Sequence, residues 1–243
     1  MVPREHCNAW VVVQDVYPTL IIGASRGIGR ALAERLITTG KPVITMGRTA
    51  PELSGTVAHI THDVLGPDFP SDQLPPALSG LVYCPGSIDL KPLRSTKSDD
   101  LRAAFELNAI GAFSTIHACT ERLKNVPGSG IVLFSTVAVQ RGMAFHTSVA
   151  AAKGAVEGMM RSLAAELAPT VRVNCIAPSL TRTSLAEKLL SSPEREKASA
   201  ERHPMKRVGE ASDIAAMAAY LLSEEAGWIT GQVIGVDGGM SAI

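Results

Sequence analysis

The sequence predicts a single α/β domain in which a doubly wound parallel sheet of about seven strands carries helices on both faces. Short apolar runs rich in β-branched residues alternate with longer segments of helical periodicity along the 243 residues. A hydrophobic fraction of 46% is enough for a substantial core, and no repeat, low-complexity tract or linker divides the chain. We therefore expect one domain over residues 18–243, preceded by an N-terminal extension over residues 1–17.

Seven apolar runs are expected to form the strands. They cover residues 19–22, 43–46, 57–60, 81–84, 131–135, 171–176 and 233–236. Ile28, Leu32 and Leu36 fall on one face at helical spacing and predict the first helix, and Val156 and Met160 begin the same pattern in a later one. Alternation of this kind is typical of a parallel sheet that is covered on both faces.

Two of the connections between strands are too short or too rich in helix breakers for a full crossover helix. Residues 48–56 contain Pro51 and Gly55, so any helix between the second and third strands is vestigial. The next connection contains four prolines, at positions 67, 70, 75 and 76, and leaves room for only a turn or two.

The charge balance excludes partners that are recognised by a strong field. Lysine and arginine (23) equal aspartate and glutamate (23), and the sequence pI is about 7.0. A neutral protein of this kind does not attract nucleic acid or an anionic membrane surface over long range. We expect a small-molecule substrate, with neither nucleic acid nor a membrane as partner.

The cysteines and the start of the chain predict a cytoplasmic location. The four cysteines lie far apart without CxxC spacing, which indicates free thiols and no metal site. The apolar run at residues 10–13 is too short for a secretory signal and is followed by Asp15. No stretch approaches the roughly 18 apolar residues of a membrane span.

A glycine-rich turn at residues 23–29 (GASRGIG) follows the first predicted strand and precedes the first helix. Glycine lets the backbone turn sharply and approach a pyrophosphate, and the free N–H groups of the following helix stabilise that anion. The order of strand, turn and helix therefore predicts a Rossmann-type dinucleotide site. The alternative is a helix that only packs tightly against a strand.

The spacing GxxxGxG resembles the first turn of the short-chain dehydrogenase/reductase family, and the resemblance extends over residues 19–240. Cys84-Pro85-Gly86 resembles the family's Asn-Ala-Gly, Asn108 matches its mid-helix asparagine, and residues 173–178 and 231–239 resemble its closing segments. The resemblance implies a set of coenzyme-binding residues. These are Gly23, Ser25, Arg26, Gly27, Ile28, Gly29, Arg48, Asp63, Val64, Pro85, Gly86, Asn108, Lys153, Pro178, Thr181 and Thr183.

The choice of coenzyme follows from charge. NAD-selective sites carry an acidic residue near the end of the second strand, which binds the ribose hydroxyls and repels a 2′-phosphate. Here that position is Arg48, and Arg26 in the turn adds a second cation. Guanidinium groups suit phosphate, so NADP(H) is preferred, with NAD(H) possible. The alternatives are that both arginines are solvated surface charges and that Asp63, expected near the adenine, only forms a turn.

The reaction centre implied by the family is incomplete. The family pairs tyrosine and lysine as YxxxK; Lys153 is present, but Val149 stands in place of the tyrosine, and the tyrosines at 17, 83 and 220 lie elsewhere. Thr136 stands where a catalytic serine is expected. His146, one helical turn before Val149, is the first choice as substitute acid because imidazole titrates near neutrality. Ser148 and Lys153 itself are the other candidates.

The catalytic candidates are therefore Asn108, Thr136, Lys153 and His146, although the Asn108 amide can alternatively serve only to satisfy backbone groups. They predict an NADP(H)-dependent oxidoreductase that acts on a small organic carbonyl, alcohol or activated alkene with altered proton-donor chemistry. The alternative is a non-catalytic NADP(H)-binding protein, such as a redox sensor or an inert family member, and a lyase or isomerase remains a third reading.

Three further expectations come from the resemblance. Dienoyl-CoA reductases are similar in lacking that tyrosine, although their substitute has no counterpart that the sequence identifies. The resemblance also implies a mobile substrate lid over residues 185–204. It implies a homo-oligomer, dimer or tetramer, paired through helices near residues 99–123 and 150–168 and through the final strand.

Overall fold

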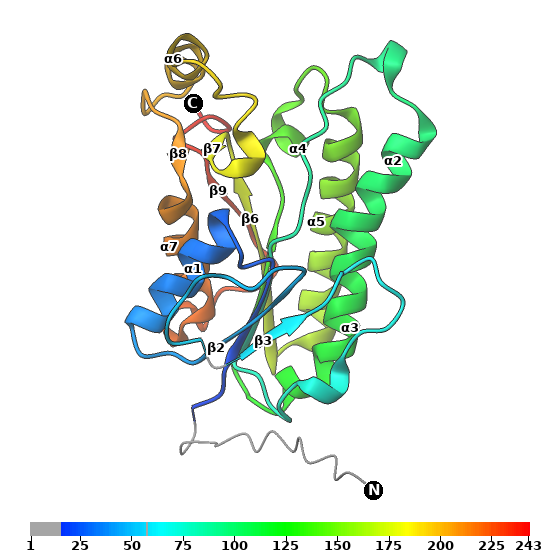
Figure 1. Ribbon diagram of the computed structural model, residues 1–243, viewed down its shortest axis with the longest axis vertical. Helices are drawn as coiled ribbons and strands as arrows, with labels where there is room; N and C mark the ends of the chain where they lie inside the picture. The colour runs from blue at the N-terminus through cyan, green and yellow to red at the C-terminus, as the bar shows by residue number, and fades with distance from the viewer. Residues whose placement is uncertain (1–15, 57) are drawn as a thin grey trace, which may run out of the picture.

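The computed structural model describes residues 16–56 and 58–243, and within them seven parallel strands form one sheet in the order β3-β2-β1-β4-β5-β6-β9. Helices cover both faces, with α1 and α7 on one side and α3 and α5 on the other (Figure 1). The expected Rossmann-type doubly wound fold is confirmed. Residues 1–15 of the expected extension, and Val57 at the start of the expected third strand, lie outside the described residues.

The elements have the following bounds. The strands of the main sheet are β1 (Thr19–Ile22), β2 (Val43–Gly47), β3 (Ala58–Thr61), β4 (Gly80–Tyr83), β5 (Ser129–Phe134), β6 (Val171–Pro178) and β9 (Val233–Val236), and β7 (Thr181–Arg182) pairs separately with β8 (Gly209–Glu210). The α-helices are α1 (Gly27–Thr38), α2 (Ser98–Phe105), α3 (Gly111–Lys124), α4 (Val137–Arg141), α5 (Thr147–Leu167), α6 (Pro193–Glu201) and α7 (Ala211–Leu222). Short 3-10 turns are η1 (Ser71–Gln73), η2 (Leu93–Ser95), η4 (Ser184–Ala186) and η5 (Glu224–Ala226), and η3 (Glu106–Ile110) is a π-helical turn between α2 and α3.

All seven predicted strands are present, and the two shortened connections are as expected. No helix lies between β2 and β3 in the described residues 48–56, and the connection from β3 to β4 contains only η1. The sequence did not reveal the β7–β8 pair or the π-turn, because neither has a local hydrophobic period.

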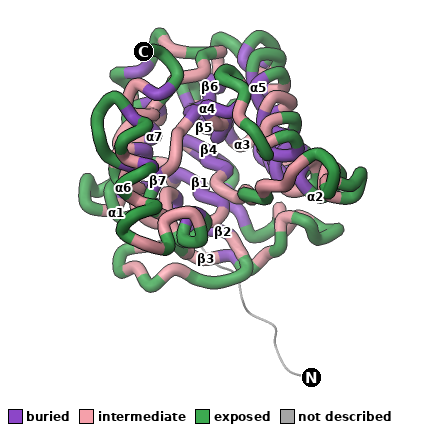
Figure 2. The backbone as a smooth tube through the Cα atoms, turned by 90° about the horizontal axis from the view of Figure 1, so that it is seen from above, coloured by how far each residue is buried: buried purple, intermediate pink, exposed green. Residues whose placement is uncertain are grey.

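The strands are buried on both faces, so successive side chains enter two different cores. Leu20 packs in the core that includes Ile116 of α3 and Met160 of α5, whereas Ile21 packs in the core that includes Leu32 of α1. Viewed from above, buried residues run through the central strands while the outer helical surfaces are exposed (Figure 2). Continuous apolar runs, rather than alternating ones, follow from this double burial.

The strand order reverses between β1 and β4, which is where parallel sheets of this kind open a crevice at the carboxyl ends of the strands. The short elements α4, α6, β7 and β8 gather at that end of the sheet (Figure 1). In the described part of the chain, no helix has both the length and the apolarity needed to cross a bilayer.

Candidate active site

The glycine turn joins β1 to the N-terminus of α1 and requires glycine for two reasons. Gly23 and Gly27 have φ values of +80° and +58°, a region that other residues rarely adopt. A Cβ atom at Gly29 would lie 2.4 Å from the carbonyl oxygen of Gly23, so helix and strand meet backbone to backbone.

The N-terminus of α1 is open to an anion. Its N-cap residue Arg26 makes no side-chain cap, and the first turn contains no acidic residue. The orphan N–H groups and the positive end of the helix dipole are therefore available to a phosphate. This fits the pyrophosphate of a dinucleotide.

A cleft of about 710 Å³ opens over this turn at the carboxyl ends of β1 to β4. It brings together twelve of the predicted coenzyme-binding residues: Gly23, Ser25, Arg26, Gly27, Ile28, Gly29, Arg48, Asp63, Val64, Pro85, Gly86 and Thr183. Thr49, His62 and Leu107 also line it and were not predicted, and Leu185, from the expected lid, lines it too. Thr49 and His62 are neighbours of Arg48 and Asp63, so their adjacency in the chain was a usable signal.

Asp63 lies in the cleft wall and also forms a local turn. It lines the cleft, and its Oδ1 accepts the N–H of Leu65 at 3.1 Å, as a turn-forming aspartate does. His62 beside it meets the ring of Phe69 edge-on, with the centroids 5.6 Å apart. The cleft wall at the end of β3 is thus ordered by local contacts.

Asn108 and Lys153 meet beneath Gly86, which lines the cleft. A Cβ atom at Gly86 would lie 3.1 Å from Oδ1 of Asn108 and 3.5 Å from Nζ of Lys153. Nδ2 of Asn108 donates to the carbonyl of Ala104 at 2.8 Å, whereas Oδ1 is buried and has no partner among the described residues. An orphaned acceptor beside a buried amine is the kind of site that a bound polar group completes.

Burial dominates the chemistry of Lys153, which is 8% exposed. Desolvation lowers the pKa of its amine from 10.5 to about 8, and the thiols of Cys175 and Cys84 lie nearby. Burial also raises the pKa of each of these thiols to about 12, so they remain neutral at ordinary pH. Burial is therefore the main cause of the lowered pKa of Lys153.

Val149 occupies the position at which the family resemblance leads us to expect a tyrosine, and its side chain is a hydrocarbon. Val149 lies in α5 one turn before Lys153 and is buried.

Thr136 is the N-cap of α4, and its Oγ1 accepts the N–H of Ala138 at 3.3 Å. Because the oxygen acts there as acceptor, the hydroxyl hydrogen of Thr136 remains free to donate.

Ser135, one residue earlier, is turned toward α5. Its Oγ donates to the buried carboxylate of Glu157 at 2.7 Å. Ser135 therefore contacts α5, whereas Thr136 caps α4.

His146 is the N-cap residue of α5, and its ring is held by its own loop. Nδ1 lies 2.7 Å from the carbonyl oxygen of Ala144. Because a carbonyl can only accept, Nδ1 carries the hydrogen and Nε2 is the free nitrogen of the neutral ring. No contact in the described residues joins His146 to Lys153, seven positions further along the chain.

Three of the predicted coenzyme-binding residues come from the end of β6 and the segment after it, and they do not all lie at the cleft. Pro178 ends β6, and the Cγ2 methyl of Thr183 would lie 3.4 Å from a Cβ at Gly27, so Thr183 is next to the glycine turn. Thr181 instead lines a neighbouring cavity of about 330 Å³, and its Oγ1 donates to the carbonyl of Ser179. The structure therefore does not bring Thr181 into the coenzyme cleft.

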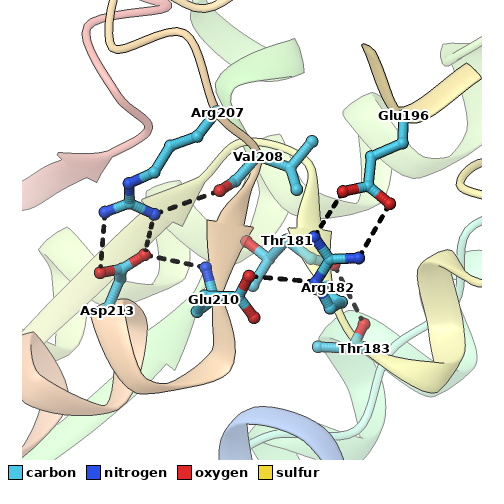
Figure 3. A network of polar contacts seen from close by, with 8 residues as sticks. All are labelled: Thr181, Arg182, Thr183, Glu196, Arg207, Val208, Glu210 and Asp213. Carbon is cyan, nitrogen blue, oxygen red and sulfur yellow. Dashed lines mark hydrogen bonds and ion pairs between the residues drawn. The ribbon is translucent and has the colours of Figure 1, made fainter. Parts of the chain in front are cut away.

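The segment that follows is anchored by Arg182 (Figure 3). Its guanidinium forms two hydrogen bonds with Glu196 of α6, at 2.6 and 3.0 Å, and a third with Glu210 at 3.0 Å. Arg207 and Asp213 form a second bidentate pair close by. These contacts fasten α6, within the expected lid, to the β7–β8 pair.

Comparison with known proteins gives consistent matches. A family model described as enoyl-(acyl carrier protein) reductase matches residues 71–241. The short-chain reductase protein NovJ of Streptomyces niveus is 32% identical over 251 aligned positions, covering 94% of this chain and 95% of that protein. The peroxisomal 2,4-dienoyl-CoA reductase of Saccharomyces cerevisiae is 36% identical over 141 positions, covering 57% of this chain and 48% of that protein. The ligand-free aldohexose dehydrogenase of Thermoplasma acidophilum superposes with a TM-score of 0.87 at 28% identity, covering 94% of this chain and 95% of that one.

Proposed function

This chain belongs to the short-chain dehydrogenase/reductase family, and we propose that it is an NADP(H)-dependent oxidoreductase acting on a small organic carbonyl, alcohol or activated alkene. One arrangement carries the proposal. The cleft places the open N-terminus of α1 and two arginines along one wall, with the amine of Lys153 beneath its floor at Gly86.

The preference for NADP(H) rests on Arg26 and Arg48. Both are exposed residues that line the cleft, one in the glycine turn and one directly after β2. A 2′-phosphate at the end of β2 would meet guanidinium groups where an NAD-selective site has a carboxylate. NAD(H) lacks that phosphate, so it would bind more weakly.

The residues at the reaction centre have separable tasks. When bound, the nicotinamide supplies or accepts a hydride. Lys153 would donate hydrogen bonds to its ribose hydroxyls, Asn108 would offer its unpartnered oxygen beside that amine, and the hydroxyl of Thr136 would donate to the substrate oxygen. Positioning of this kind contributes roughly 7–11 kcal/mol to a rate and does not need the missing tyrosine.

The proton must come from another group, because Val149 cannot donate one. Loss of a general acid removes about 10²–10⁴-fold in rate, or roughly 3–5 kcal/mol, which positioning can exceed. His146 remains the first candidate because, with Nδ1–H held by the carbonyl of Ala144, the protonated ring would have an Nε2–H to donate. Ser148 and Lys153 are the other candidates.

A turnover panel tests the activity. The protein is mixed with NADPH and a set of ketones, quinones and enones, and coenzyme oxidation is followed. We expect turnover with at least one class. NADPH binding without turnover, and activity that appears only in Val149→Tyr, would favour the non-catalytic binding protein that Val149 suggests. Conversion of a substrate with no net change in NADPH would indicate a lyase or isomerase.

The coenzyme preference has its own test. Arg48→Ala removes a charge-assisted contact worth about 1.5–3 kcal/mol, so the Kd for NADPH should rise about 10- to 150-fold. The Kd for NADH should change much less, because no 2′-phosphate is lost. Arg102→Ala, at an exposed position in α2 outside the cleft, is the matched control. Equal losses for both coenzymes would remove the case for NADP(H).

We also propose a homo-oligomer, dimer or tetramer, that works in the cytoplasm. Ile110, at the end of η3, and Phe113, in the first turn of α3, are each 49% exposed, which suits a face that pairs with another copy. Cys84, Cys119 and Cys175 are free, as thiols of a reducing compartment are. Light scattering on Phe113→Glu, which should shift the mass toward the monomer, tests the pairing; an unchanged mass contradicts it.

A further inference from the structure

The helical segment that carries Asn108 is interrupted by the π-turn η3, and the interruption frees one carbonyl. In an α-helix the N–H of Gly111 would bond to the carbonyl of Leu107. Here it bonds to the carbonyl of Glu106, five residues back. The hydroxyl of Tyr83, from the end of β4, donates to the carbonyl of Leu107 at 2.7 Å. The tyrosine thus takes the place of the helical donor that the π-turn removes.

The fit between Tyr83 and the turn leaves no spare room. Tyr83 is 3% exposed, and a Cβ atom at Gly111 would lie 2.4 Å from its hydroxyl oxygen and 3.4 Å from its Cζ. Only glycine at position 111 lets the hydroxyl reach the helix backbone. Tyr83 and Gly111 are therefore an interlocking pair, twenty-eight positions apart in the sequence.

Asn108 lies inside this turn, directly after the carbonyl that Tyr83 holds. Its Nδ2 donates to Ala104, which leaves Oδ1 unpartnered and turned toward Gly86 and Lys153. Tyr83 and Gly86 come from the same strand end, three residues apart. The end of β4 therefore fixes Asn108 in two ways. Tyr83 holds the neighbouring carbonyl of Leu107, and Gly86 leaves space for the amide oxygen of Asn108. π-Turns within α-helices occur often at functional sites.

We propose that Tyr83 is a positioning residue of the reaction centre, whose hydroxyl holds the π-turn so that the Asn108 amide oxygen lies beside Lys153. The proposal rests on the function proposed above. Tyr83 does not act on the substrate, because its hydroxyl is committed to Leu107 and is buried away from the cleft lining. Burial also raises the pKa of its phenol well above the ordinary value, which keeps it a neutral donor.

A double-mutant cycle tests the interlock without any substrate. Gly111→Ala should lower the melting temperature by about 4–10 °C in the wild-type background, because the methyl group meets the hydroxyl. In Tyr83→Phe the same substitution should cost less than about half of that, because the nearest remaining atoms, the Glu106 carbonyl oxygen and the ring Cζ, lie 3.3 and 3.4 Å from the methyl position. An equal cost in both backgrounds would show that the hydroxyl does not define the turn.

Kinetics then separate positioning from mere stability. Tyr83→Phe should lower kcat about tenfold, the effect of one misplaced hydrogen bond, while the Kd for NADPH changes by less than about threefold. Tyr220→Phe, at an exposed position of α7, should leave kcat unchanged. A variant Tyr83→Phe that melts lower but keeps the wild-type kcat would make Tyr83 structural only.

A crystal structure of Tyr83→Phe gives a readout that is independent of activity. We expect the Asn108 amide to leave its place beside Gly86 or to lose a single orientation. If the π-turn and the Asn108 oxygen stay where they are, the proposal is wrong. Absence of NADPH binding in the wild type would overturn the proposed function instead, and the stability cycle and this structure would still decide the role of Tyr83 in the turn.

Discussion

Lys153→Met should stabilise the free protein at neutral pH while weakening coenzyme binding. The amine is 8% exposed, and desolvation lowers its pKa from 10.5 to about 8. Methionine has a similar length and carries no charge to desolvate. The substitution therefore removes a cost of folding that the wild type carries for its function.

The size and sign of the effect follow from proton linkage. The unfolded chain keeps the lysine proton up to about pH 10.5, whereas the folded chain releases it near pH 8. Between these values the unfolded state binds more protons, so wild-type stability rises with pH in that window. Below pH 8 the folded wild type bears the full cost, about 3 kcal/mol for a shift of about 2.5 pKa units. The advantage of Lys153→Met should therefore be largest at pH 7 and vanish near pH 10.5.

Urea denaturation at pH 7 and at pH 10, without coenzyme, measures this difference. The free energy of unfolding of Lys153→Met should exceed that of the wild type by about 3 kcal/mol at pH 7 and by much less at pH 10. Lys41→Met, at an exposed position after α1, should give the same small difference at both pH values. NADPH should bind Lys153→Met at least about tenfold more weakly. A variant less stable than the wild type at pH 7, or a difference that does not depend on pH, would refute the burial account.

Three other perturbations address the turn, the lid and the proton donor. Gly29→Ala places a methyl group 2.4 Å from a backbone oxygen, so the Kd for NADPH should rise more than about tenfold. Gly158→Ala, with nothing within 4 Å, should bind NADPH as the wild type does. Fluorescence titration compares the two variants, and equal affinities would contradict the close approach of helix and strand at Gly29. Arg182→Gln breaks the pair with Glu196, so limited proteolysis of residues 185–204 should accelerate while stability changes by less than about 1 kcal/mol. An unchanged cleavage rate would mean that the pair does not hold the expected lid. His146→Gln should flatten the pH dependence of kcat if imidazole is the acid, and an unaltered pH profile would retire it.

The local pattern of the sequence determined the fold class and the coenzyme turn. Strand and helix periods are properties of neighbouring residues, so the seven strands could be read within one or two residues of their ends, as for residues 81–84 against Gly80–Tyr83. Gly23, Gly27 and Gly29 carry their meaning in spacing alone, because the turn they form is local. The replacement of the expected tyrosine by Val149 is equally plain in the sequence.

Only the tertiary structure decided which distant groups meet. Nothing in the chain signals that Tyr83 reaches the carbonyl of Leu107. The family resemblance assigned Asn108 and Lys153 to one reaction centre, but only the packed chain shows that both side chains lie close to Gly86. The same holds for the pairing of Arg182 in β7 with Glu196 in α6. Such contacts depend on how strand ends and helices are brought together by burial of their apolar faces, and burial is a property of the packed chain rather than of any short stretch of it.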